Sequence, residues 1–101
     1  MGQQFLDQYS ILHFSSGAIA YFWGVGFFKW FLVHASFEVV ENTESGINFI
    51  NTSLTWWPGG KPKADTMLNI FGDHASALAG WWLASTLDQT GKKRGWYKPI
   101  D

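Results

Sequence analysis

The chain has 101 residues, of which only 15% are charged and 19% are aromatic, and its net charge at pH 7 is −1. A net charge this close to zero gives no electrostatic case for a nucleic-acid surface. Because it contains no cysteine, disulfides and thiolate metal sites are excluded. The length predicts a single domain over residues 1–101.

The few ionisable residues are unevenly distributed along the chain. In two long runs, residues 11–37 and 67–87, the only charged or histidine residues are His13, Lys29, His34, Asp73 and His74. Weakly charged runs with charged ends are typical of membrane segments. We therefore predict an all-α integral membrane protein with three transmembrane helices in one membrane domain. The alternative is a compact soluble protein, which would need more polar surface to cover so many aromatic side chains.

The first run fits either one helix or two. A single helix over residues 10–42 would be about 50 Å long, which exceeds a hydrocarbon core of about 30 Å. A break at Gly24 and Gly26 instead gives a tight hairpin over residues 8–43, because glycine tolerates the backbone angles of a turn. The hairpin, with helices over 8–24 and 27–43, is the favoured prediction.

Residues 44–64 are rich in Asn, Ser, Thr, Gly and Pro, and the stretch "PGGKP" predicts a loop. A third helix is expected over 65–88, with Asp65 at its N-terminus and Gly91 ending it. Four of the seven basic residues follow, which predicts a cytoplasmic C-terminus, or its stromal or matrix equivalent. Aromatics suited to an interfacial belt are Trp56, Trp57, Trp81 and Trp82.

The third predicted helix carries a polar face and a small-residue face. Asp65, Asn69 and Asp73 are spaced four residues apart and therefore share one side of the helix. Small residues at the same spacing lie beside them and permit close helix packing. The predicted packing positions are Gly17 in the first helix and Gly72, Ser76 and Gly80 in the third.

The other two helices bring polar residues to the same side of the molecule. His34, Glu38 and Glu41 share one face of the second helix, and His13 begins the first. The predicted polar intramembrane cluster consists of His13, Glu38, Glu41, Asn42, Asp65, Asn69 and Asp73. Because carboxylates bind hard divalent cations, candidate metal ligands are Glu38, Asp65 and Asp73.

Several of these polar residues, and the neighbouring His34 and His74, have a competing structural interpretation. Hydrogen bonds between helices are the alternative for His13 and His34, and a solvated helix end is the alternative for Glu41. Asp65 could be a plain cap, and His74 is assigned to packing. Paired acids could also share a proton at a raised pKa instead of holding an ion.

Three short motifs in order carry a family resemblance: "HFSSGAIAYF", "FEVVEN" and "DTMLNIFGD". They resemble the VanZ-like superfamily of small membrane proteins, most closely its uncharacterised DUF2585 family, over roughly residues 11 to 85. The resemblance implies a shared polar site formed by His13, Glu38, Glu41, Asn42, Asp65, Asn69 and Asp73. The chain departs from the family pattern in its tight first hairpin and in Ala64, where the family has glycine.

Two functions remain open from the sequence. The favoured one is a non-catalytic accessory subunit of a larger membrane protein complex, with membrane lipids and other subunits as partners. The alternative is a VanZ-like protein whose acidic pocket binds a lipid headgroup or a divalent cation, with enzymatic activity undecided. The expected bound group is a lipid, a pigment or a divalent cation.

Overall fold

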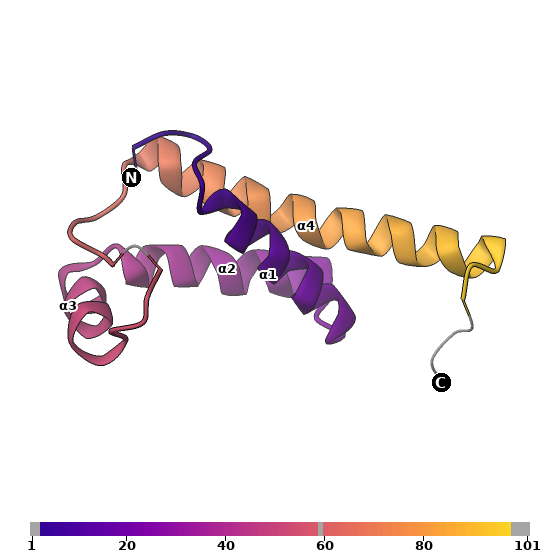
Figure 1. The fold of residues 1–101 in the computed structure, drawn as a ribbon, viewed down its shortest axis with the longest axis horizontal. Coiled ribbons are helices and arrows are strands. Elements are labelled where there is room, and N and C mark those ends of the chain that lie inside the picture. The colour runs from indigo at the N-terminus through magenta and orange to yellow at the C-terminus, as the bar shows by residue number, and fades with distance from the viewer. Residues whose placement is uncertain (1–2, 59, 98–101) are drawn as a thin grey trace.

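The computed structural model describes residues 3–58 and 60–97. These residues form four helices: α1 (Ser10–Phe22), α2 (Phe27–Glu41), α3 (Glu44–Ser53) and α4 (Met67–Arg94). The molecule is elongated, measuring 47 × 25 × 22 Å, and α4 runs along its length (Figure 1). α1 and α2 both pack on α4, and α3 packs against α2.

The first hydrophobic run is divided into two helices at the glycines that the sequence indicates. α1 ends at Phe22, and α2 begins at Phe27. Gly24 between them has φ +85°, a left-handed conformation that glycine adopts without steric cost. The indole nitrogen of Trp81 donates to the Val25 carbonyl oxygen at 2.7 Å and thereby ties this turn to α4.

The prediction of three transmembrane helices is wrong. No helix within the described residues is both long and apolar enough to cross a membrane. α1 has 13 residues and α2 has 15, whereas a span needs about 20. α4 has 28 residues, but polar residues such as Asn69, Asp73 and Asp88 interrupt its apolar stretches. The predictions of an integral-membrane localisation and a cytoplasmic C-terminus depended on these spans and are therefore wrong as well. Lys98, in the basic tail, lies outside the described residues.

The boundaries of the later elements also differ from the prediction. The expected loop 44–64 begins with α3, because the Thr43 side chain caps that helix by accepting from the Gly46 amide. The expected third helix, 65–88, is α4 and starts later, since Thr66 rather than Asp65 accepts from the Asn69 amide. α4 continues past Gly91 to a left-handed cap at Gly95, with φ +69°.

The C-terminal end of α4 is held by hydrogen bonds to one buried carboxylate. The Tyr21 hydroxyl donates to Asp88 Oδ2 at 2.6 Å, and the Tyr97 hydroxyl donates to Asp88 Oδ1. Lys92 Nζ lies 3.1 Å from Asp88 Oδ2. These contacts hold the pKa of Asp88 at about 2, with the hydrogen bond from Tyr21 as the largest cause. Asp88 therefore links the end of α1 and the segment after α4 to the long helix.

Glycine allows α1 to lie directly on α4. A Cβ atom added to Gly17 would lie 1.9 Å from the Ala77 carbonyl oxygen, and one added to Gly80 would lie 1.8 Å from the Phe14 carbonyl oxygen. Neither position accepts a side chain unless the backbones separate. The N-terminal segment approaches α4 in the same way, with the Phe5 carbonyl against Gly72.

We expect Gly80→Ala to lower the free energy of unfolding by about 1–3 kcal/mol or more, because the new methyl group meets backbone rather than a movable side chain. Urea unfolding followed by circular dichroism measures the change. Gly26→Ala is the matched control, since its Cβ would have no atom within 4 Å. Equal stability of the two variants would contradict the close contact between α1 and α4.

Candidate metal centre

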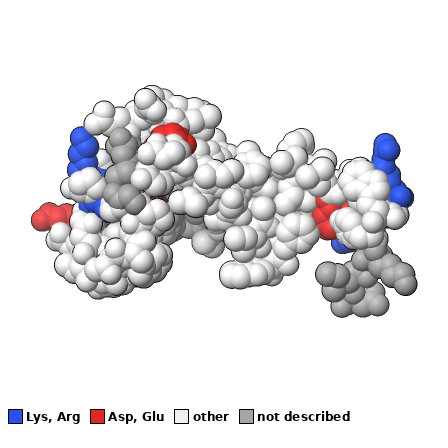
Figure 2. Space-filling model, viewed as in Figure 1, with Lys and Arg blue, Asp and Glu red and all other residues white. Residues whose placement is uncertain are grey.

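The interior of the protein is unusually polar. Only four hydrophobic residues are buried among the described residues, and three of them are alanines. The buried polar and charged residues are His34, Glu38, Glu41, Lys61, Asn69, Asp73, Ser76 and Asp88. Large apolar side chains are exposed instead, and Figure 2 shows charges at both ends of one face with an uncharged middle. The centre of the molecule is therefore occupied mainly by polar and charged side chains.

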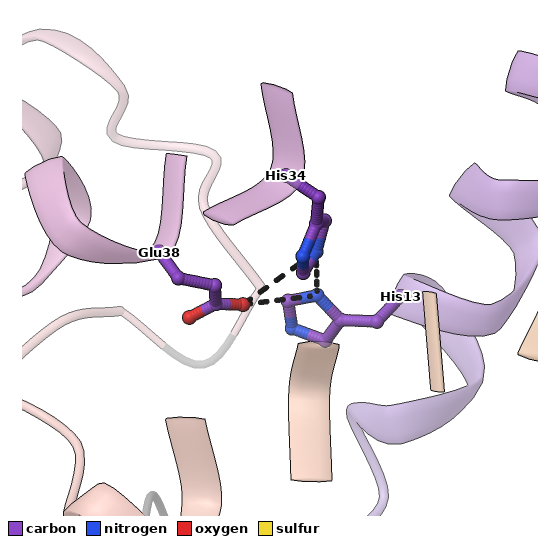
Figure 3. Close-up of side chains that lie close together, drawn as sticks. All are labelled: His13, His34 and Glu38. Carbon is purple, nitrogen blue, oxygen red and sulfur yellow. Dashed lines mark hydrogen bonds and ion pairs between the residues drawn. The ribbon is translucent and has the colours of Figure 1, made fainter. Parts of the chain in front are cut away.

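Three side chains from α1 and α2 converge on one point in this interior (Figure 3). His13 Nδ1 lies 3.1 Å from His34 Nε2, a hydrogen bond between the helices that confirms the alternative given for these two residues, and 3.4 Å from Glu38 Oε1. His34 Nε2 lies 3.6 Å from the same Glu38 oxygen. His34 and Glu38 are one helical turn apart on α2, which aligns their side chains. The close packing of α1 brings His13 to them.

The spacing of these three atoms matches that of metal ligands. Two donors bound at about 2.0–2.1 Å to one tetrahedral zinc ion are about 3.3–3.4 Å apart. The three measured separations, 3.1, 3.4 and 3.6 Å, bracket that value. Two imidazoles and one carboxylate are also a ligand set that zinc uses in enzymes.

The outward nitrogens of both imidazoles also have polar neighbours. His13 Nε2 lies 3.3 Å from Asp73 Oδ2, and His34 Nδ1 lies 3.0 Å from His74 Nδ1. Metal-bound histidines usually donate their second nitrogen to such a partner, which fixes the ring and its tautomer. A tautomer with protons on these outward nitrogens would leave lone pairs on the two nitrogens that face Glu38.

Glu38 is the most deeply buried acid, with 1% of its surface exposed. Neither of its carboxylate oxygens has a hydrogen-bond partner within the part of the chain that the structure describes. An uncompensated buried carboxylate is costly, so buried acids are normally hydrogen-bonded, protonated or bound to a cation. The Glu38 carboxyl group therefore requires either a proton or a bound cation.

Further carboxylates surround Glu38. One oxygen from each of Glu38, Glu41, Asp65 and Asp73 fits within a group whose atoms all lie within 4.8 Å of one another. Lys61 is buried beside this group, with Nζ 2.8 Å from Asp65 Oδ2. The site therefore combines two imidazoles, four carboxylates and one ammonium group.

Two asparagines of the predicted cluster support the site through the backbone. The Asn42 amide nitrogen donates to the Glu38 carbonyl oxygen, and its Oδ1 accepts from the Asp65 backbone amide at 2.7 Å. This contact fixes Asp65 although it precedes α4. The Asn69 amide nitrogen donates to the Gln4 carbonyl oxygen at 2.6 Å and so holds the N-terminal segment on α4.

Burial shifts the pKa values of Glu38, Glu41 and His34. It raises the pKa of Glu38 well above its usual range, and a hydrogen bond with the Glu41 carboxyl group, together with its charge, raises this pKa further. Burial also raises the pKa of Glu41. The pKa of His34 is lowered to about 3, first by burial and then by the neighbouring His13 and His74. At neutral pH His34 is therefore neutral, which is the form that binds metal ions.

A pocket of about 400 Å³ opens beside the cluster. The members of the cluster that line it are His13, His34, Glu41, Asp65, Asn69 and Asp73. Apolar and aromatic side chains also line it, including Leu12, Trp30, Val33, Phe37, Trp56 and Trp57. A pocket with a mostly apolar lining and a few convergent polar groups is typical of a small-molecule site.

The structure brings five predicted site residues together: His13, Glu38, Glu41, Asp65 and Asp73. The predicted packing residues Gly17, Gly72 and Gly80 lie at backbone contacts, and Ser76 is buried. Of the predicted belt, Trp56 and Trp57 line the pocket, Trp81 bonds to the turn before α2, and Trp82 is exposed.

His34 was absent from the predicted cluster, although its four-residue spacing from Glu38 carried the signal. His74 was assigned to packing, and it does contact Phe31 with ring centroids 4.6 Å apart. Its contact with His34 depends on the rotation of α4 relative to α2, which spacing along one helix does not reveal. The burial of Lys61 inside a predicted loop had no signal in the sequence.

Comparison with protein-family models, curated proteins and solved structures finds no match to this chain. The resemblance to VanZ-like proteins stays a prediction.

The pKa shifts predict a pH-dependent stability for the metal-free protein. A carboxyl group with a raised folded-state pKa, such as Glu38, stabilises the fold fully below pH 4.5 and loses this contribution as the pH rises. His34 has the opposite sign, but its contribution changes only below its unfolded pKa of 6.5. Between pH 7 and 9 the carboxyl groups therefore dominate, and stability falls by up to about 1.4 kcal/mol per pH unit.

Urea unfolding in a chelator at pH 7, 8 and 9 measures this slope. Glu38→Gln keeps the side-chain volume without the titrating group, so its slope should be clearly smaller. Glu44→Gln, an exposed acid at the start of α3, is the matched control and should keep the wild-type slope. An identical slope in the wild type and Glu38→Gln would exclude Glu38 as the titrating group.

Proposed function

We propose that the protein binds one zinc-like divalent cation through His13, His34 and Glu38, and presents the ion's fourth coordination position to a ligand in the adjoining pocket. The observation that carries this proposal is the spacing of 3.1, 3.4 and 3.6 Å between the three donor atoms. This function corresponds to the acidic, cation-binding pocket that the sequence offered as the alternative, and it does not depend on a membrane.

A purely structural cluster is the competing explanation, and the contacts of Glu38 argue against it. A structural carboxylate would accept hydrogen bonds from its neighbours, as Asp88 does from two tyrosines. Among the described residues no neighbour donates a hydrogen bond to Glu38, although two imidazoles lie beside one of its oxygens. A hydrogen bond between the Glu38 and Glu41 carboxyl groups requires a proton on one of them. A cation at the point that the three donors face would compensate this charge.

Three protein ligands leave one coordination position for a fourth group. Structural zinc sites are closed by four protein ligands, whereas sites that bind water or substrate keep one position open. His13 and His34 both line the pocket, so a ligand there reaches the metal without passing through the core. The bound ion would polarise an oxygen atom of that ligand, while the apolar side chains that line the pocket would contact the rest of the ligand.

Zinc binding to the purified full-length protein tests this proposal. We expect wild type to bind one zinc ion tightly in a chelator-competition titration. Glu38→Gln should weaken binding by at least about 100-fold, because it removes a ligand and not only an outer contact. The same substitution should leave the helical circular dichroism unchanged, since glutamine fills the same space.

Glu44→Gln again serves as the matched control and should bind zinc as wild type does. Wild-type affinity in Glu38→Gln, or no zinc binding by wild type, would refute the proposal. A His34→Ala variant provides a second test that removes a nitrogen ligand instead of a carboxylate.

The exposed apolar surface favours a second candidate function, that of a subunit in a protein assembly. Trp23 is 82% exposed and Phe28 is 72% exposed, and both lie near the turn between α1 and α2. Large exposed apolar patches mark interaction sites, because isolated domains rarely leave them open to water. The partner would be another protein chain that covers this aromatic surface.

Native mass spectrometry of the protein purified from its own cells tests the second candidate. We expect a complex of fixed stoichiometry with at least one other chain. Phe28→Ser should reduce recovery of that complex, since it removes a large exposed apolar side chain from the surface. Recovery of the protein only as a free monomer would contradict this function.

A further inference from the structure

We propose that the centre holds two divalent cations, with the Glu38 carboxylate bridging an ion on His13 and His34 to a second ion on Glu41, Asp65 and Asp73. The inference rests on the proposed function, because it places the second ion beside the first. It assigns a role to the carboxylates that a single zinc-like ion leaves unused.

The two candidate donor groups share one residue. The first group is His13, His34 and Glu38, and the second is Glu38, Glu41, Asp65 and Asp73. Within each group the donor atoms lie within 4.8 Å of one another, close enough to surround one ion. Paired metal ions in enzymes are about 3.5–4 Å apart, which is the separation that one bridging carboxylate supports.

Glu38 has one oxygen available for each ion. Oε1 lies 3.4 Å from His13 Nδ1 and 3.6 Å from His34 Nε2, so it belongs to the first group. In Figure 3 the other oxygen points away from both imidazoles. This second oxygen is buried and accepts no hydrogen bond from a described residue unless a proton is shared between the Glu38 and Glu41 carboxyl groups. A single ion on Oε1 would leave it uncompensated.

The chemistry of the donors separates the two positions. The first has two nitrogens, which suit zinc and similar transition metals. The second has only carboxylates, which suit harder ions such as Mn²⁺ or Mg²⁺. Taken together, four carboxylates and two histidines are also the ligand inventory of the dinuclear carboxylate sites found inside helix bundles.

Lys61 is the competing cation for the second position. Its ammonium group lies 2.8 Å from Asp65 Oδ2 and is buried with it. One ammonium charge does not balance four adjacent carboxylates, and although its field also acts on Glu41, its direct ion pair is with Asp65. The lysine therefore leaves the part of the group around Glu38 and Glu41 available to an ion.

The experiment loads the full-length protein with one equivalent of Zn²⁺ and then titrates it with Mn²⁺. Native mass spectrometry counts the zinc, and the loss of the free Mn²⁺ electron paramagnetic resonance signal counts the bound manganese. We expect one zinc and one manganese per chain. Glu41→Gln should retain zinc but weaken manganese binding by at least about 10-fold. Glu44→Gln, the matched control, should bind both ions.

The possible outcomes separate failure of the second metal site from failure of the first. Zinc binding without manganese binding would overturn the second ion and leave the proposed function in place. Failure to bind zinc would overturn the proposed function and the inference that rests on it. Manganese binding of equal strength in Glu41→Gln and wild type would place that ion elsewhere and overturn the bridged pair.

Discussion

The rest of the structure depends on the contact between the backbones of α1 and α4. Gly80 lets the Phe14 carbonyl lie against α4, and Gly17 lets the Ala77 carbonyl lie against α1. Because His13 immediately precedes Phe14, this contact carries its ring to Asp73 on one side and to Glu38 on the other. Side chains larger than hydrogen at the two glycines would separate the helices and draw His13 away from its partners.

The polar interior and the apolar exterior follow from the same arrangement. Small residues face the centre of the bundle, so little apolar surface is buried there, and ionisable side chains occupy the remaining space. Hydrophobic burial therefore contributes less to stability than in a typical domain of this size. Whatever compensates the charge of the buried carboxylates has a large influence on how stable the fold is.

Helical structure and much of the site were predictable from the sequence, because both depend on local spacing. Gly24 indicated the break between two helices, and the spacing of Glu38 and Glu41 placed both acids on one face of α2. The prediction of membrane spans was wrong because a low density of charge was taken for a long apolar helix. α3 was missed because a single capping residue, Thr43, begins a helix in a segment whose composition is typical of loops.

The parts that the sequence could not supply depend on the relative rotation of helices. His34 meets His13 across a helix pair, and His74 meets His34 across another. Such pairings are set by side-chain packing at the crossing points, which no periodicity along one helix records. Lys61 was unpredictable for a related reason, since Asn51 bonds to its backbone amide and carbonyl oxygen and so positions it in the interior.

The donors of the centre come from both ends of the chain, with His13 in the first helix and Asp73 in the last. A short fragment would contain only part of the set, so the centre forms only when distant segments have closed on one another. Loop-closure entropy opposes that step, and contacts of long sequence separation slow it. An ion bound there would link the first and last helices, and its binding energy would become part of the free energy of folding.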